Sequence, residues 1–301
     1  CNAAGIKPGQ LPFLVPAGSV AGTLTKAAAK KLGLLQGLPV IAAASDSVCY
    51  KIGAGIVAAG QGIISLGTAA SMNVVSDRRV TISRRVSISC TPSATPGTWD
   101  VTAIHPSAGL MLDWLKKIVR FDKPSELDRI IEASGDVDPG ADGLIALPYL
   151  FGSSIPRDAN VGAAFIGIRA AHGNRHMTRA ILEGVGYALN DLFDGIARLV
   201  NRPTSFRLVG GSARSLTWAK ILTDILATPI ETVSAEEPAL VGAAAVAAVQ
   251  IGLYGDLESA VSAMTSVDRR LEPGPAAEHY DSAYQRYRQL AETIRRVSTD
   301  S

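Results

Sequence analysis

The sequence predicts an α/β chain in which helices flank a mixed β-sheet. Its 301 residues are 47% hydrophobic and 19% charged, and include 29 glycines, a composition that can bury one large core or two moderate ones. Short apolar runs in the first third of the chain have the spacing of antiparallel strands, and strand-like and helix-like runs alternate after residue 200. Antiparallel strands followed by a β-α-β-α series indicate a mixed sheet.

The strands come first. An apolar run at 39–44 predicts a buried strand that delivers the carboxylate of Asp46 at its end. Runs at 62–66 and 71–75 flank a four-residue turn and predict a tight β-hairpin. A further run at 85–90 is expected to join the same sheet, which would then begin with three consecutive antiparallel strands.

Helical periodicity follows. The predicted helices cover 107–120, 124–133, 174–200, 216–226, 238–251 and 276–297. Strands at 206–209 and 230–233 precede the fourth and fifth of these helices, and the proline-broken segment 135–160 is expected to be irregular. The apolar face of the first helix is expected to consist of Leu110, Trp114, Leu115 and Ile118. The last helix is expected to pack on the domain through a stripe of Tyr280, Tyr284, Tyr287 and Leu290.

Charge and composition argue against several function classes. A formal net charge of +2 disfavours a nucleic-acid surface, and Arg78-Arg79 and Arg84-Arg85 are interpreted as a solvated hairpin end rather than an anion site. Three cysteines without C-x-x-C spacing favour reduced thiols, and four scattered histidines predict no metal site. The longest apolar run, 238–251, is too short to span a bilayer. With no secretory signal, the chain is expected to be cytoplasmic.

The most specific pattern is GAAFIGIRAAHGNRHMTRAILE, residues 162–183. Small, apolar, glycine and aliphatic positions are supplied by Ala163, Phe165, Gly167 and Ile168, and after a spacer the helix start is supplied by His176, Met177, Ala180, Ile181, Leu182 and Glu183. The pattern resembles the second signature of the FGGY family of ATP-dependent carbohydrate kinases. The alternative interpretation of residues 162–183 is a buried turn followed by a core helix. That structure would require only a few of the matching residues, whereas the family signature accounts for all of them. The resemblance implies an actin-like ATPase or ribonuclease-H-like fold.

The resemblance also implies a domain organisation. Residues 1–55 are expected to be the end of an amino-terminal FGGY domain with the inter-domain segment, and 56–301 the carboxyl-terminal nucleotide-binding domain. Most of the amino-terminal domain is expected to be absent. In this family that domain carries the first phosphate loop, an acidic residue that helps hold magnesium and most sugar contacts, so the chain alone is expected to be inactive.

Asp46 is the candidate catalytic residue. A carboxylate within reach of a sugar hydroxyl can take its proton as the new P–O bond forms. From the residues alone, Asp46 could equally cap a helix that starts near Val48. The segment 38–55 resembles the family segment that carries the catalytic base, which favours the catalytic role.

A Gly-Thr turn is the first candidate nucleotide-binding segment. Between two strands such a turn exposes backbone N–H groups and a hydroxyl, which can hold phosphate oxygens. Gly67 and Thr68 match the second phosphate loop of the family. Many relatives continue with Ser-Gly where this chain has Ala69 and Ala70, which implies one hydroxyl contact fewer.

The second candidate nucleotide-binding segment is a glycine pair between a strand and a helix. Glycines let a ligand approach the backbone, and a helix amino terminus offers N–H donors. The segment 207–226 resembles the adenosine-binding motif of the family, with contacting positions at Gly210, Gly211, Ser212 and Ala213. A dinucleotide site is disfavoured because the G-x-G-x-x-G spacing is not met.

The resemblance implies an ATP-dependent carbohydrate kinase that uses Mg²⁺ and phosphorylates a sugar or polyol, with a xylulose-like ketose as the leading substrate. Residues 152–156 read Gly-Ser-Ser-Ile-Pro where many pentulose kinases have Gly-Glu-Arg-x-Pro, so the substrate stays open. The alternative is an inactive nucleotide-binding module derived from a sugar kinase, but Asp46 favours an enzyme. The signature at 162–183 disfavours an actin-like chaperone ATPase. Expected partners are ATP or ADP and the small substrate, not nucleic acid or a membrane; homodimerisation stays open.

Overall fold

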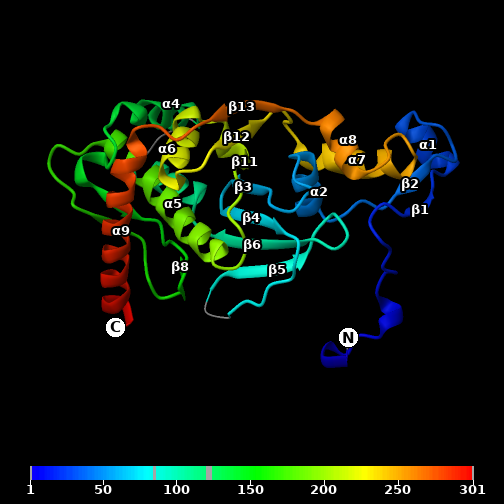
Figure 1. Cartoon of the computed structure of the whole chain (residues 1–301), viewed down its shortest axis with the longest axis horizontal. Coiled ribbons are helices and arrows are strands. Elements are labelled where there is room, and N and C mark those ends of the chain that lie inside the picture. Colours follow the sequence, from blue (N-terminus) through cyan, green and yellow to red (C-terminus); the bar gives the residue numbers. More distant parts are fainter. Residues whose placement is uncertain (1, 84–85, 120–123, 300–301) are drawn as a thin grey trace. The chain divides into compact units, whose positions relative to one another are not determined.

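The computed structural model describes residues 2–83, 86–119 and 124–299, and the chain divides into two compact units (Figure 1). The smaller unit comprises Cys1–Gly53 and Ala235–Thr265, and the larger comprises Ala54–Ser234 and Ser266–Ser301. The elements of the smaller unit are β1 (Val20–Thr23), α1 (Lys26–Leu32), β2 (Pro39–Ile41), α2 (Asp46–Gly53), α7 (Pro238–Gln250) and α8 (Leu257–Met264). No helix in the described ranges combines the length and hydrophobicity needed to cross a bilayer.

A backbone contact joins α2 to α7 in the smaller unit. A Cβ atom on Gly53 would overlap the carbonyl oxygen of Pro238, and a Cβ atom on Gly242 would overlap that of Cys49. Only glycine therefore fits at either position, because the obstacle is backbone on both sides. This glycine pair fixes how α2, which begins at Asp46, lies on α7.

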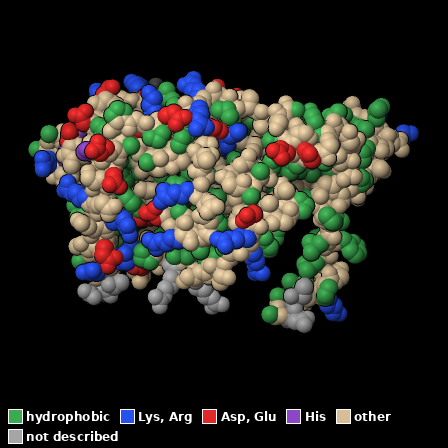
Figure 2. Space-filling view, in the orientation of Figure 1, with side chains coloured by type: hydrophobic (Ala, Val, Ile, Leu, Met, Phe, Trp, Pro, Cys, Tyr) green, Lys and Arg blue, Asp and Glu red, His purple; other side chains and the backbone are tan. Residues whose placement is uncertain are grey.

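Strands β1 and β2 pair antiparallel and leave apolar side chains exposed. The predicted strand at 39–44 is shorter, and the expectation that it is buried is wrong, because Val40 remains 44% exposed. An apolar run signals burial only where another layer covers it. Phe13 and Leu14 are 99% exposed, and hydrophobic side chains line this amino-terminal stretch (Figure 2).

The larger unit is built on a mixed sheet. In the described residues the sheet has seven strands in the order β13-β12-β11-β3-β4-β6-β5 (Figure 1). Their bounds are β3 (Gly62–Leu66), β4 (Ala70–Ser76), β5 (Ile88–Pro92), β6 (Trp99–His105), β11 (Phe206–Val209), β12 (Ile230–Val233) and β13 (Val267–Leu271). Strand β11 runs parallel to β3 and β12, and the other neighbours are antiparallel, as expected for a mixed sheet.

Helices and short strands complete the larger unit. They are α3 (Gly109–Val119), α4 (Pro124–Ala133), β7 (Ile145–Leu147), β8 (Ser153–Ser154), β9 (Arg157–Asp158), β10 (Ala164–Ile166), α5 (Asn174–Ala197), α6 (Leu216–Leu226) and α9 (Ala276–Thr299). Helix α5 packs on β4 and β6, α6 packs on β12 and β13, and the two helices pack on each other. The expected tyrosine stripe of α9 is confirmed as a packing surface, with Tyr280, Tyr284 and Tyr287 buried.

The expected hairpin forms, but the third strand pairs elsewhere. Strands β3 and β4 are antiparallel neighbours as predicted. Strand β5 pairs instead with β6, which lies between β4 and β5. The sequence analysis did not predict β6. The expected face of α3 is also partly wrong, because Ile118 is exposed while Met111 and Leu112 are buried. The interpretation of Arg84 and Arg85 lies outside the described residues.

Helix α5 carries a buried ion pair. Arg179 Nε donates to Glu183 Oε1 at 2.7 Å, and Glu183 Oε1 also accepts from the Gly140 N–H at 2.9 Å. The other Arg179 nitrogens donate to the Ser134 carbonyl at 3.2 Å and to the Tyr280 hydroxyl at 2.7 Å. Burial by itself would lower the pKa of Arg179, but the facing oxygens of Tyr280 and Glu183 raise it. The guanidinium therefore stays charged and ties α5 to α9 and to the 134–140 segment.

Candidate functional site

The turn between β3 and β4 is held by the start of α3. The carbonyl oxygens of Gly67 and Thr68 accept hydrogen bonds from the backbone N–H groups of Gly109 at 2.9 Å and Leu110 at 3.1 Å. A Cβ atom on Gly109 would lie 2.6 Å from the Gly67 oxygen, so glycine at the start of α3 allows this approach. The predicted phosphate turn thus has a fixed backbone.

The turn between β11 and α6 has one glycine that packs and one that faces open space. Gly210 has φ +105°, in the region that favours glycine, and a Cβ atom there would lie 2.6 Å from the Leu66 carbonyl oxygen. No atom lies within 4 Å of a Cβ atom built on Gly211. Helix α6 begins after Ser215, whose hydroxyl accepts from the Trp218 N–H at 3.1 Å.

Both turns open into one cavity of about 660 Å³ within the larger unit. Four of the six predicted nucleotide-binding residues line it, namely Gly67, Thr68, Gly211 and Ser212. Gly210 and Ala213 do not line it; Gly210 packs against β3, and Ala213 packs against the hydrophobic core. The structure therefore brings together two turns that lie more than 140 residues apart in the sequence.

Helices α3 and α4 supply walls of this cavity that the sequence analysis missed. The lining residues from α3 are Gly109, Leu112 and Asp113, and those from α4 are Leu127, Asp128, Ile131 and Glu132. Each set follows helical spacing, so one face of each helix is turned to the cavity. That spacing was the available signal, but for α3 it was interpreted as an apolar core face, and for α4 no face was assigned.

The cavity wall carries carboxylates rather than a cluster of cations, and the Gly67 N–H already donates to the Ala69 carbonyl oxygen at 3.0 Å. Asp113, Asp128 and Glu132 line it, and Arg214 is the one basic side chain among the described lining residues. His105 lies beside the phosphate turn, paired with Ala70 across β4 and β6, but burial lowers its pKa to about 4. The imidazole is therefore neutral at pH 7 and adds no positive charge beside the turn.

Asp46 is the first residue of α2, in the smaller unit. Its side chain is exposed, and within the described part of the chain its carboxylate makes no hydrogen bond or ion pair. The N–H groups of Val48 and Cys49 bond instead to the Ser45 carbonyl oxygen. This geometry gives no support to the capping role, and the role of general base stays a prediction.

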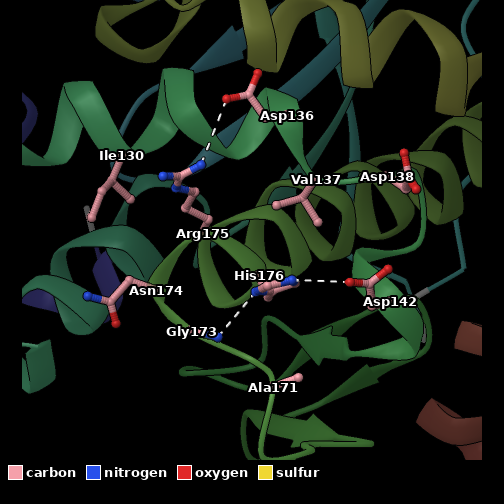
Figure 3. Close-up of a pocket in the computed structure, with 10 residues that line it drawn as sticks. All are labelled: Ile130, Asp136, Val137, Asp138, Asp142, Ala171, Gly173, Asn174, Arg175 and His176. Carbon is pink, nitrogen blue, oxygen red and sulfur yellow. Dashed lines mark hydrogen bonds and ion pairs between the residues drawn. The ribbon is translucent and has the colours of Figure 1, made fainter.

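A second cavity, of about 760 Å³, lies at the start of α5 (Figure 3). His176 Nδ1 accepts from the Gly173 N–H at 3.1 Å, and His176 Nε2 lies 3.1 Å from Asp142 Oδ2. This pairing places the imidazole proton on Nε2. The polar start of the signature helix therefore serves to cap α5. The described residues form no cluster of three or more metal-ligating side chains here or elsewhere.

Comparisons with known proteins agree on one family. The profile of the FGGY family of carbohydrate kinases, C-terminal domain, matches residues 62–251. A xylulose kinase from Staphylococcus epidermidis is 32% identical over 284 residues, which cover 94% of this chain and 56% of the relative. A gluconokinase from Bacillus subtilis is 28% identical over 284 residues, covering 90% of this chain and 54% of the relative.

The structure also matches a solved protein of this group. The crystal structure of xylulose kinase from Rhodospirillum rubrum superposes with a TM-score of 0.85 at 28% identity, covering 99% of this chain and 60% of that one. The chain thus spans about half the length of the curated relatives it matches.

Proposed function

Because the chain belongs to the FGGY family of carbohydrate kinases and has its actin-like ATPase fold, we propose that it forms the nucleotide-binding part of such a kinase. The proposed reaction transfers the γ-phosphoryl group of ATP to a hydroxyl of a sugar or polyol. Relatives that match are named as kinases, which favours an enzyme over an inactive nucleotide-binding module.

The observation that carries the proposal is the shared cavity of the two turns. The Thr68 hydroxyl and the turn backbone around it suit the oxygens of a diphosphate or triphosphate. On the neighbouring turn, Gly211 leaves open space against which a nucleoside can lie. A cavity that joins an anion-binding turn to a glycine-lined nucleoside wall fits ATP.

Asp46 is proposed as the base that takes the proton of the acceptor hydroxyl. Its carboxylate has no partner within the described residues, so it is free to accept a proton. Removing that proton makes the hydroxyl oxygen a better nucleophile as the P–O bond forms. We include Mg²⁺ in the proposal, because kinases take ATP as its magnesium complex, in which the cation contacts phosphate oxygens and few protein groups. A cytoplasmic location is also part of the proposal.

A xylulose-like ketose is the leading proposed acceptor, since the S. epidermidis relative is named a xylulose kinase. Where many pentulose kinases are expected to carry Glu-Arg, this chain has Ser153 and Ser154, both 6% exposed. The Ser153 hydroxyl donates to the Pro156 carbonyl at 2.7 Å, so it is satisfied within this loop. Because the chain differs from many pentulose kinases at these two positions, other acceptors remain open, such as gluconate, after which the B. subtilis gluconokinase is named.

Residues 1–55 are proposed to end an amino-terminal FGGY domain. The chain covers 56% of the S. epidermidis relative, and the amino-terminal segment of the smaller unit exposes Phe13 and Leu14 almost fully. Large apolar side chains gain about 1.5–3 kcal/mol each on burial, so such a surface suits coverage by further protein.

Replacing Gly211 with valine is expected to lower the affinity for ADP by at least about tenfold, or 1.4 kcal/mol. The new side chain would occupy the open space into which the Cβ position of Gly211 points. Calorimetry on the 301-residue chain measures the effect, with a wild-type dissociation constant expected between about 1 μM and 1 mM.

Gly162→Val is the matched control. A Cβ atom on Gly162 also meets nothing within 4 Å, and Gly162 does not line the cavity. It should bind ADP like the wild type. Undiminished ADP binding by Gly211→Val would remove the assignment of the nucleoside site.

A further inference from the structure

The carboxylate of Glu132 connects α4 to the start of α6. One oxygen accepts from the Ser215 hydroxyl at 2.7 Å, and the other accepts from the Thr217 hydroxyl at 2.7 Å. Hydrogen bonds from a hydroxyl to a charged carboxylate are shorter and stronger than those between neutral groups. Both carboxylate oxygens are therefore committed to one short segment, 83–85 residues away in the sequence.

The same contact orders the first turn of α6. Because the Ser215 hydroxyl gives its hydrogen to Glu132, its oxygen can accept from the Trp218 N–H, which it does at 3.1 Å. The Thr217 side chain lies against Gly135, where a Cβ atom would be 3.3 Å away. The indole of Trp218 is fully buried behind this turn.

Glu132 and Ser215 both line the proposed nucleotide cavity, so their hydrogen bond forms part of its wall. The turn at Gly67 and Thr68 is held by different contacts, those from the Gly109 and Leu110 N–H groups to the Gly67 and Thr68 carbonyl oxygens. The two sets of hydrogen bonds share no residue.

We propose that Glu132 is a positioning residue that fastens α4 to the α6 amino terminus and thereby shapes the cavity wall next to Gly211, where the nucleoside is proposed to lie. This inference rests on the proposed function, because it assumes that a nucleotide occupies the cavity. Loss of the carboxylate would free α4 to move away from the glycine turn. Affinity for ligands that contain adenosine would fall, and affinity for phosphate chains alone would not.

Calorimetry with ADP and with inorganic triphosphate tests the proposal on the 301-residue chain. Glu132→Ala is expected to weaken ADP binding about tenfold and to leave triphosphate binding within about twofold. Thr217→Val removes one hydroxyl donor with little change in shape, and Thr217 does not line the cavity. It should weaken ADP binding several-fold in the wild-type background and have no effect when Glu132 is already alanine.

The control is Arg129→Ala, an exposed position on α4 that does not line the cavity, which should bind both ligands like the wild type. Thermal melting checks that each variant is folded. A silent Thr217→Val would overturn the inference, since a direct contact between Glu132 and the ligand would not need Thr217. Equal losses for ADP and triphosphate would overturn it as well. Absence of ADP binding by the wild-type chain would instead sink the proposed nucleotide site, and the inference with it.

Discussion

Asp46→Asn is expected to lower kcat by about 10²–10⁴ in an enzyme that carries both FGGY domains, with nucleotide affinity nearly unchanged. Asparagine keeps the shape of the side chain but cannot take the proton of the acceptor hydroxyl. Because the carboxylate of Asp46 has no hydrogen bond within the described residues, its loss should not disturb α2.

A coupled ADP-release assay over ketoses, aldoses and polyols gives kcat and KM for each variant. Glu258→Gln is the matched control, since Glu258 is an exposed acid in the first turn of another helix of the same unit, α8. It should leave turnover unchanged. Turnover of Asp46→Asn within a few-fold of the wild type would exclude Asp46 as the base.

Arg179→Leu is expected to reduce the free energy of unfolding by about 3–5 kcal/mol. The substitution would leave the Glu183 carboxylate, which is 2% exposed, without its charged partner. It would also leave the Ser134 carbonyl and the Tyr280 hydroxyl without the donors that now reach them. Urea denaturation followed by circular dichroism measures the loss.

Arg175→Ala, one turn earlier on α5, provides the comparison. Arg175 lies 3.9 Å from Asp136, and the two side chains are 61% and 79% exposed, so this pair should contribute no more than about 1 kcal/mol. The double variant Arg179→Leu with Glu183→Leu should be less destabilised than Arg179→Leu alone, because no unpaired charge stays buried. Equal stability of Arg179→Leu and the wild type would show that the pair contributes nothing to folding.

Local sequence chemistry predicted much of the fold. The turn at residues 67–70 marks the β3–β4 hairpin, and apolar spacing places α5 and α6 within a few residues of their observed ends. The place of β5 at the edge of the described sheet was missed because its partner, β6, was not recognised as a strand, although the two form a local hairpin. The pairing of β6 with β4 joins residues that are more distant in sequence. The exposure of Ile118 likewise depends on how α3 packs on α5, which the periodicity of α3 alone does not determine.

In the candidate site, too, residues with a local sequence signature could be predicted and residues without one could not. Gly67, Thr68 and Gly211 could be proposed from the sequence because glycine turns have a local signature, and the structure places them around one cavity. Asp113 and Glu132 were missed because each occupies an ordinary helical position. The hydrogen bond from Ser215 to Glu132 joins residues that are 83 positions apart in the sequence, so no local pattern predicts it.

The paired glycines of α2 and α7 bear on how mutational scans of this protein should be interpreted. Any side chain at Gly53 or Gly242 meets a main-chain carbonyl, so no repacking of neighbouring side chains can make room for it. A saturation screen scored on activity alone would therefore rank both positions among the least tolerant of the chain. They would look like reaction-centre residues although neither carries a side chain. Scoring protein abundance alongside turnover would separate them from Asp46, whose replacement should leave abundance intact.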